Sequence, residues 1–287
     1  MSTTTISKTE KVKSAASDKS AQKSAVKNEK IEVDSRMNLI KHKIFILSGK
    51  GGVGKSTVAV NLATSLALSG KKVGLLDIDF HGPSVPQMLN LSNVSVPMTG
   101  EEIIPVTDGK NLKVMSIGFA LDNADSSVIW RGPLKARLIK QFLGNVQWGA
   151  LDYLIVDSPP GTGDEPLSLA QLIPHPDGAI IVTTPQLISI NDVRRCVGFC
   201  KRMNLKVIGV IENMSGFVCP NCGEITDIFK IGGGRQMSDY LDIPFLGSIP
   251  LEKDIVSASD EGKPFILHYP GTMAAHMFNK IIENILN

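Results

Sequence analysis

The chain of 287 residues is poor in aromatic side chains, in cysteine and in net charge. Aromatic residues make up only 5%, so the core must be aliphatic, as in buried parallel sheets. Four cysteines are too few for a disulfide scaffold, which indicates a reducing, cytoplasmic compartment. A net charge of +2 gives no support to a nucleic-acid-binding surface. No apolar run approaches the length that spans a membrane.

The beginning of the chain differs in composition from the rest. It is rich in Lys, Ser, Thr and Ala, and residues 1–36 hold seven Lys and one Arg against five acids. Such a segment buries too little apolar surface to offset the entropy of ordering, so we expect residues 1–37 to be a disordered tail. With 43% hydrophobic residues in the chain, residues 38–287 should form one domain with a substantial core.

Short apolar runs alternate with helical patterns through the rest of the chain. Most runs are unbroken and β-branched, which is typical of strands buried on both faces. Helix-length segments between them predict right-handed βαβ units, and hence an α/β fold with a mostly parallel, twisted sheet flanked by helices. The predicted strands are Lys43–Ser48, Lys72–Asp77, Leu112–Ser116, Leu151–Asp157, Ala179–Thr184, Lys206–Ile211 and Phe245–Ile249.

Residues 49–57 have the pattern of a phosphate-binding loop. They are Gly49, Lys50, Gly51, Gly52, Val53, Gly54, Lys55, Ser56 and Thr57. The segment follows a predicted strand and opens a helical pattern, and in that context glycine amides and a helix N-terminus bind phosphate. Lys55 should reach the β- and γ-phosphates of ATP, and the Ser56 hydroxyl should ligate Mg²⁺. A glycine-rich turn without a ligand is the alternative.

Three acidic residues stand at the ends of predicted strands. Asp77 and Asp79 close one apolar run, and Asp157 closes another, before a segment rich in glycine and proline that resembles a switch loop. The carboxyl ends of parallel strands gather at one edge of a sheet, so these carboxylates should face the phosphate loop. Helix capping is the alternative role for each Asp. Three of them beside one loop favour chemistry.

Cys219 and Cys222 form a CxxC pair, with Pro220 between them and Gly223 after them. Two thiolates at this spacing predict a metal-binding knuckle, but structural zinc and a [4Fe–4S] cluster both normally take four protein ligands. The chain has no second CxxC, and a homodimer would supply the missing pair by twofold symmetry. A thioredoxin-like redox pair and a structural zinc knuckle are the alternatives.

Two further patterns predict packing rather than chemistry. Cys196 and Cys200 lie four residues apart in a helical segment, so we expect both in the interior. The segment Met273–Leu286 carries an apolar stripe with only Lys280 and Glu283 charged. That balance predicts a helix packed on its own domain rather than on an anionic membrane.

Together these motifs resemble the Mrp/ApbC family of iron–sulfur cluster carrier ATPases, over roughly residues 38–286. The second lysine early in the loop, Lys50, is similar to the deviant Walker A signature of the MinD, ParA and nitrogenase-iron-protein class. The CxxC pair and the sequence His-Gly-Pro-Ser separate the family from MinD and ParA. The segments that carry the resemblance are the phosphate loop, Asp77–Pro86, Trp130–Pro133, Asp157–Asp164 and Cys219–Cys222.

The resemblance assigns roles to individual residues. It implies an ATP-bound homodimer in which Lys50 reaches across to the nucleotide of the other subunit. Asp79 would orient the attacking water, and Asp157 would hold Mg²⁺. Asn213 would contact the adenine ring, and Pro250 with the residues after it would form a second adenine-side loop.

The function that the resemblance implies is ATP hydrolysis coupled to carriage of a [4Fe–4S] cluster. The cluster would bridge Cys219 and Cys222 of two subunits, come from iron–sulfur scaffold donors and pass to apo-proteins, with neither nucleic acid nor membrane as a partner. The residues alone leave open a MinD- or ParA-like positioning ATPase and a zinc-stabilised regulatory NTPase. Residues 1–36 lack the N-terminal cysteine motif of the eukaryotic scaffold relatives, so a short prokaryotic carrier is expected.

Overall fold

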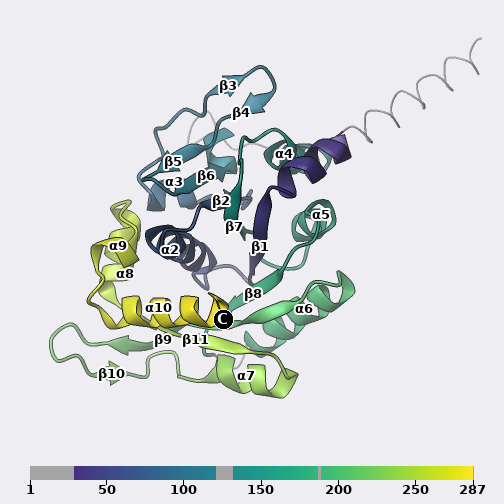
Figure 1. The fold of residues 1–287 in the computed structure, drawn as a ribbon. Helices are drawn as coiled ribbons and strands as arrows, with labels where there is room; N and C mark the ends of the chain where they lie inside the picture. Colours follow the sequence, from purple (N-terminus) through teal and green to yellow (C-terminus); the bar gives the residue numbers. More distant parts are fainter. Residues whose placement is uncertain (1–28, 121–131, 187–188, 287) are drawn as a thin grey trace, which may run out of the picture.

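The computed structural model describes residues 29–120, 132–186 and 189–286. A nine-stranded, mostly parallel sheet runs through this part of the chain, with helices on both faces (Figure 1). Its strands are β1 (Ile40–Leu47), β2 (Val73–Asp77), β5 (Val106–Asp108), β6 (Leu112–Ser116), β7 (Leu151–Asp157), β8 (Gly178–Thr183), β9 (Val207–Val218), β10 (Ile225–Thr226) and β11 (Phe245–Leu251). A separate two-stranded sheet consists of β3 (Met98–Thr99) and β4 (Glu102–Ile103).

The strand order is β10-β9-β8-β1-β7-β2-β6-β5, and β11 also pairs with β9. Only β5 and β10 run antiparallel to their neighbours in this sheet. The helices are α2 (Lys55–Leu68), α3 (Val85–Met88), α4 (Gly132–Gly144), α5 (Asp164–Leu172), α6 (Ile190–Arg202), α7 (Gly233–Leu241), α8 (Lys253–Asp260), α9 (Phe265–His268) and α10 (Met273–Leu286). The predicted α/β fold is confirmed.

Strand β1 shows how the two faces of the sheet are filled. Ile44 and Ile46 pack with residues of α2 and α10, whereas Phe45 and Leu47 pack on the opposite face with residues of α4 and α5. Successive side chains of a strand point to opposite faces, so an unbroken apolar run is buried on both. The sheet is therefore the middle of three layers.

The C-terminal helix α10 packs on its own domain, as predicted. Phe278, Ile281 and Ile282 are buried in the core shared with α2, and the apolar stripe is thereby covered. Within the described ranges, no helix is long and apolar enough to cross a membrane.

Strand β9 is longer than predicted. The sequence indicated an end at Ile211, but the strand continues to Val218. It does so because Phe217 and Val218 pair with β10, and β11 accompanies it as far as Phe217. Asn213 consequently lies within a strand rather than in a turn that follows one.

The boundary between tail and domain also differs from the prediction. Residues 29–37 form a helix, on which Val33 and Met37 are buried at 3% and 0% exposure. These side chains, four residues apart, share one helix face and pack against the core beneath α4. The Lys43 ammonium donates to the carbonyl of Ile40 at 3.0 Å, just beyond the end of this helix. A disordered segment 1–37 is thus wrong for residues 29–37, and residues 1–28 lie outside the described part.

We expect Met37→Ala to lower the free energy of unfolding by about 2–5 kcal/mol, since it leaves a cavity in a core site. Leu39→Ala, two residues away at a side chain that is 54% exposed, is the matched control and should change it by less than about 0.5 kcal/mol. Urea unfolding followed by fluorescence measures both. Equal stabilities of the two variants would contradict the packing of this helix.

Candidate functional site

The phosphate loop joins β1 to α2 in the middle of the sheet, where β1 lies between β7 and β8. Gly52 and Gly54 have φ values of +78° and +79°, in the left-handed region that favours glycine. A Cβ on Gly54 would also overlap the side-chain amide of Asn213. The loop therefore needs glycine for its backbone conformation and for the close approach of β9.

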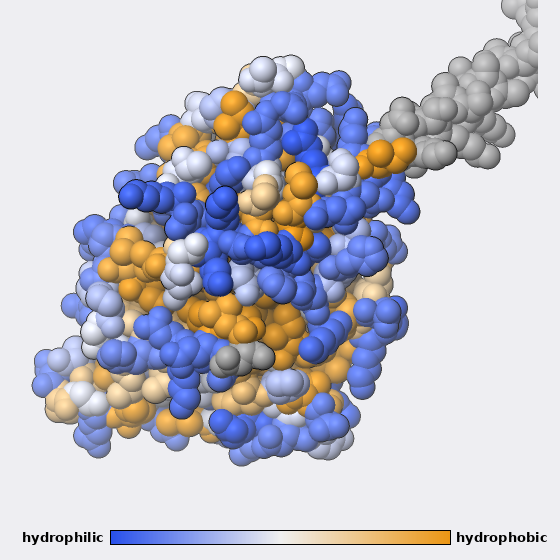
Figure 2. Space-filling view, viewed as in Figure 1, coloured by the Kyte–Doolittle hydropathy of each residue, from blue (hydrophilic) through white to orange (hydrophobic). Residues whose placement is uncertain are grey.

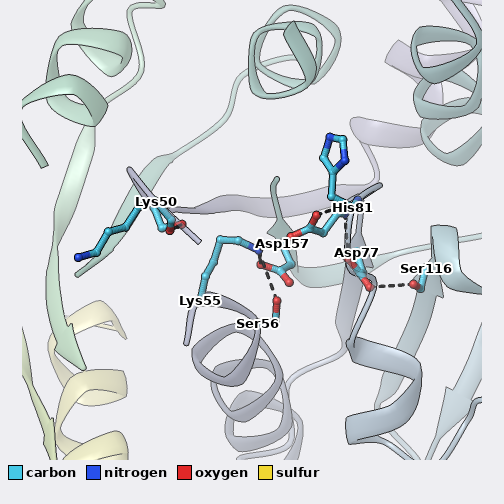
Figure 3. Close-up of polar contacts among 9 residues, drawn as sticks. Lys50, Lys55, Ser56, Asp77, His81, Ser116 and Asp157 are labelled. Atoms are coloured by element: carbon cyan, nitrogen blue, oxygen red, sulfur yellow. Dashed lines mark hydrogen bonds and ion pairs between the residues drawn. The ribbon is translucent and has the colours of Figure 1, made fainter. Parts of the chain in front are cut away.

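The side chain of Lys55 lies at the centre of the site, at 6% exposure. Its ammonium is 2.5 Å from Asp157 Oδ1, 3.7 Å from Asp79 Oδ2 and 3.4 Å from Ser56 Oγ. The ends of β2 and β7 thus meet the first turn of α2, as the parallel topology predicted (Figure 3). The structure brings together the lysine, the hydroxyl and two of the three predicted carboxylates.

Asp157 is fully buried, and one of its two carboxylate oxygens makes no hydrogen bond within the described part of the chain. Burial raises the pKa of its carboxyl, and the adjacent Lys55 ammonium opposes that rise. Among the described residues, its Oδ2 atom has no hydrogen-bond partner. Carboxylate and hydroxyl oxygens are the ligands that Mg²⁺ prefers, so Asp157 and Ser56 fit that ion.

Asp77 has a different role from the one the sequence suggested. Its carboxylate does not bond to Lys55; it accepts hydrogen bonds from the Asp79 amide at 3.0 Å and from Ser116 Oγ at 2.8 Å (Figure 3). Burial, and then the charge of Asp157, raises the pKa of Asp77 to about 7. Asp77 is therefore a positioning residue for the turn that presents Asp79, and Ser116 was not identified from the sequence.

The raised pKa of Asp77 gives a pH-dependent prediction. The folded protein keeps this proton up to about pH 7, whereas the ordinary value for the carboxyl is 3.8. The folded state then binds more protons than the unfolded state between these values, so the free energy of unfolding falls as pH rises from 4 to 7. We expect Asp77→Asn to make this fall shallower, in urea unfolding series across that range.

The exposed Asp239→Asn is the control for this series, and it should leave the slope with pH unchanged. A slope in Asp77→Asn equal to that of the unsubstituted protein would contradict the assignment of the titration to Asp77.

A lysine from α4 links the two segments that follow Asp79 and Asp157. Lys135 Nζ lies 2.5 Å from Glu165 Oε1 and 3.5 Å from His81 Nε2, and it stands 5.4 Å from the centre of the Phe80 ring. Partial burial opposes ionisation of Glu165, but the bond from Lys135 prevails and lowers its pKa. The sequence did not identify this cluster. Trp130 and Arg131, which contributed to the resemblance, lie outside the described residues.

A cavity of about 220 Å³ opens beside the phosphate loop. Asn213 and Pro250, the two residues expected at the adenine ring, both line it, together with Thr57 and Ile255. Asn213 Nδ2 donates to the carbonyl of Val53 in the loop at 2.9 Å, which fixes the amide at the cavity wall. The combination of apolar walls and one oriented amide is typical of a site for a planar heterocycle.

The side chain of Lys50 points away from Lys55 and the carboxylates (Figure 3). None of the hydrogen bonds and ion pairs found within the described residues involves its ammonium. The neighbouring Gly49 lies so close to Asp192 of α6 that a Cβ there would overlap it. The backbone at the start of the loop is thereby held in place while the half-buried Lys50 side chain points away from Lys55.

Cys219 and Cys222 lie in the turn between β9 and β10, as expected for a knuckle in a loop. The Cys219 amide donates to the Glu224 carbonyl and the Gly223 amide to the Cys219 carbonyl, each at 2.9 Å. Backbone amides of Cys222 and Asn221 also donate to the Cys219 sulfur and lower the pKa of its thiol. The turn therefore favours the thiolate, which is the form that ligates metals.

The cysteine pair offers two thiol groups in one turn. Across the described ranges, no cluster of three or more His, Cys, Asp or Glu side chains could hold a metal ion. The other two cysteines, Cys196 and Cys200, are buried in α6, where burial raises the pKa of each thiol to about 12. Their prediction as core residues is confirmed.

An apolar patch lies next to the cysteines. Figure 2 shows hydrophobic residues along the lower edge of the molecule, over the β9–β10 hairpin. The side chains of this hairpin patch are 37–54% exposed and are those of Ile225 in β10 and of Ile228, Phe229 and Ile231 in the segment that follows β10. The patch therefore places exposed apolar surface close in the chain to the cysteine turn.

Comparisons with known proteins agree with this geometry. An iron–sulfur cluster carrier protein of Methanocaldococcus jannaschii is 51% identical over 256 residues, which cover 89% of this chain and 87% of the relative. The cytosolic Fe–S cluster assembly factor CFD1 of Kluyveromyces lactis is 49% identical over 258 residues, with coverages of 86% and 91%. Eukaryotic assembly factors are thus as similar to the chain as an archaeal carrier, so the resemblance does not single out a prokaryotic form.

A solved structure is also similar. It is a nucleotide-binding protein of Archaeoglobus fulgidus in complex with ADP, which is 39% identical with a TM-score of 0.73 and covers 86% of this chain and 99% of the other. A family model described as ParA, NUBPL iron-transfer P-loop NTPase, matches residues 39–286. The chain belongs to this family of iron-transfer P-loop NTPases.

Proposed function

We propose that this protein is a cytoplasmic ATPase that carries a [4Fe–4S] cluster between two copies of the chain. The cluster comes from iron–sulfur scaffold donors and is transferred to apo-proteins. The observation that carries the proposal is the half-formed site at Cys219 and Cys222 in a chain that also has a phosphate loop with an outward-pointing Lys50. The names of the relatives, a cluster carrier and a cluster assembly factor, support it.

The nucleotide part of the proposal assigns one task to each polar side chain. Lys55 binds the β- and γ-phosphates, and Ser56 and Asp157 hold Mg²⁺, which neutralises phosphate charge when bound. Asp79 orients the attacking water, because its carboxylate lies 3.7 Å from Lys55 Nζ at the same edge of the sheet. The 220 Å³ cavity beside Asn213 receives the adenine ring.

Two separate features support a dimer. Lys50 points away from Lys55 and the carboxylates of its own site, so its ammonium is left for a nucleotide on another subunit. Cys219 and Cys222 supply two thiolates where a cluster takes four, and the hairpin patch beside them supplies apolar surface to bury. Twofold symmetry satisfies both requirements with one partner, a second copy of the chain.

A positioning ATPase that uses a terminal helix as a membrane anchor receives no support. The apolar stripe of α10 is already buried against α2 and the sheet. A zinc-bound dimer would use the same four thiolates, so the metal content of the dimer distinguishes it from the cluster carrier.

We expect anaerobic reconstitution with iron and sulfide to give about four irons per dimer. Cys219→Ala and Cys222→Ala should each reduce this to less than about one iron per dimer, because the bridging ligand set is then incomplete. Both variants should bind ADP as the unsubstituted protein does. Iron analysis, absorption spectroscopy and calorimetry provide the three measurements.

Cys196→Ala is the matched control, since it removes a thiol from the core and leaves the turn intact. It should retain the iron. A full cluster in Cys219→Ala, or stoichiometric zinc in place of iron, would contradict the assignment.

Hydrolysis should depend on both lysines. Lys55→Ala is expected to slow ATP hydrolysis by about 100-fold or more, as the loss of one preorganised charge at the transferring phosphoryl group does. Lys50→Ala should bind nucleotide normally but hydrolyse it as slowly as Lys55→Ala does, because the Lys50 ammonium that it lacks acts on the nucleotide of the other subunit. The exposed Lys110→Ala is the control and should match the unsubstituted protein.

Mixing the two inactive variants tests action across the interface. A heterodimer of Lys50→Ala and Lys55→Ala chains contains one site with both lysines intact. An equal mixture should therefore recover about one quarter of the normal rate, since about half of the dimers are mixed and each has one working site of two. No recovery after subunit exchange would contradict a role of Lys50 in trans.

A further inference from the structure

Strand β9 leads from the nucleotide site to the cysteines. Asn213 in this strand donates to the phosphate loop through Val53, and five residues beyond it the strand ends beside Cys219. Glu212, the preceding residue, points to the opposite face, because successive side chains of a strand alternate. Its Cβ lies against Gly234 of α7. Adjacent residues of one strand thus contact the phosphate loop and the helix that follows the cysteine turn.

Glu212 is completely buried and has three hydrogen-bond donors on its carboxylate. Ser215 Oγ donates to Oε1 at 2.5 Å, Gly232 N donates to Oε1 at 2.9 Å, and Gly234 N donates to Oε2 at 2.5 Å. Ser215 lies just before residues 216–231, the excursion that contains both cysteines, and the two glycines lie just after it. One carboxylate therefore holds both ends of the excursion.

The three glycines next to this carboxylate cannot be replaced by larger residues without a clash or backbone strain. A Cβ on Gly234 would lie 3.0 Å from Glu212 Oε2, and one on Gly233 would overlap the Pro185 carbonyl. Gly232 has a φ of +86°, in the region that favours glycine. The three glycines let the first amides of α7 approach the carboxylate, and the positive end of the helix dipole favours its charge.

We propose that Glu212 is a positioning residue that couples nucleotide binding at the phosphate loop to the placement of Cys219 and Cys222. A shift of the Val53 peptide on nucleotide binding moves Asn213 and with it β9. The Glu212 carboxylate transmits that movement to both ends of the excursion at once. The proposal rests on the proposed function only in taking these cysteines as the cluster ligands.

An amide at position 212 breaks this connection with little change in shape. Glutamine offers one acceptor oxygen and one donor group where the carboxylate offers two acceptor oxygens. Its donor would face an amide N–H that also donates, so at least one end of the excursion is released. Glu212→Gln should therefore loosen the excursion while Asn213 still holds the loop.

The alkylation rate of the cysteine turn measures the coupling without any metal. Metal-free protein is treated with iodoacetamide, with and without saturating Mg-ADP, and the modified peptides are quantified by mass spectrometry. Cys196 and Cys200 are buried with high thiol pKa values, so they stay unmodified while the chain is folded and serve as an internal reference. The readout is the ratio of the rates at Cys219 and Cys222 with and without nucleotide.

In the unsubstituted protein we expect nucleotide to change this alkylation rate by about fivefold or more, which is within the ordinary range of coupling between two sites. In Glu212→Gln the change should be less than about twofold. Nucleotide affinity, measured by calorimetry, should remain within about threefold. Glu224→Gln makes the same change inside the excursion, at an exposed side chain, and should keep the full response.

A full response in Glu212→Gln would overturn the proposal, as would a rate in the unsubstituted protein that ignores nucleotide. If Glu212→Gln unfolds, which modification of Cys196 and Cys200 would reveal, Ser215→Ala takes its place. That variant removes one of the three bonds and should reduce the response. Iron plays no part in this readout, so the absence of a cluster would remove the proposed cargo and leave the coupling result standing.

Discussion

The parallel pairing of β1 with β7 and β8 is the constraint on which the rest of the structure depends. Its register sets Ile46 opposite Asp157, and β7 in turn sets Asp157 opposite Asp77. On the other side, β8 sets Thr183 opposite Glu212 of β9. Asp77, Asp157 and Thr183, the last residues of β2, β7 and β8, therefore stand in one row beside the loop that follows β1, and Glu212 lies next to Thr183 in the middle of β9. An error of one residue in this register would send their side chains to the wrong face.

The row concentrates negative charge around one ammonium. Asp79 and Asp157 both lie within 4 Å of Lys55, and Asp77 stands behind them with its pKa raised to about 7. Burying a carboxylate costs free energy unless the group is paired, protonated or metal-bound. Here Asp79 and Asp157 are paired with Lys55, and the raised pKa of Asp77 favours its protonated form. The orphaned oxygen of Asp157 remains available to the third. A site of this composition favours the arrival of a cation together with phosphate.

Sequence reasoning succeeded where a pattern is local. The phosphate loop, the strand-end acids Asp79 and Asp157, and the cysteine turn each occupy a short stretch of sequence, and the structure places each of them where the sequence indicated. It failed where partners lie far apart in the chain. Three contacts depend on packing between elements that are distant in the sequence. They are the ion pair of Lys135 with Glu165, the hydrogen bond from Ser116 to Asp77 and the hydrogen bond from the Gly234 amide of α7 to Glu212. The helix at 29–37 was missed because most of its residues are polar, and only two apolar side chains, Val33 and Met37, are buried.

The two sites lie in one chain, but each needs a second chain in the proposed carrier. No hydrogen bond or ion pair found among the described residues involves the Lys50 ammonium, and in that carrier Cys219 and Cys222 supply half of a ligand set. Anaerobic native mass spectrometry of the reconstituted protein tests this account most directly. It predicts that the added mass of one [4Fe–4S] cluster is found on the dimer, and that the monomers present in the same sample carry no metal. A monomer that retains its own metal, or a dimer with zinc alone, would contradict it.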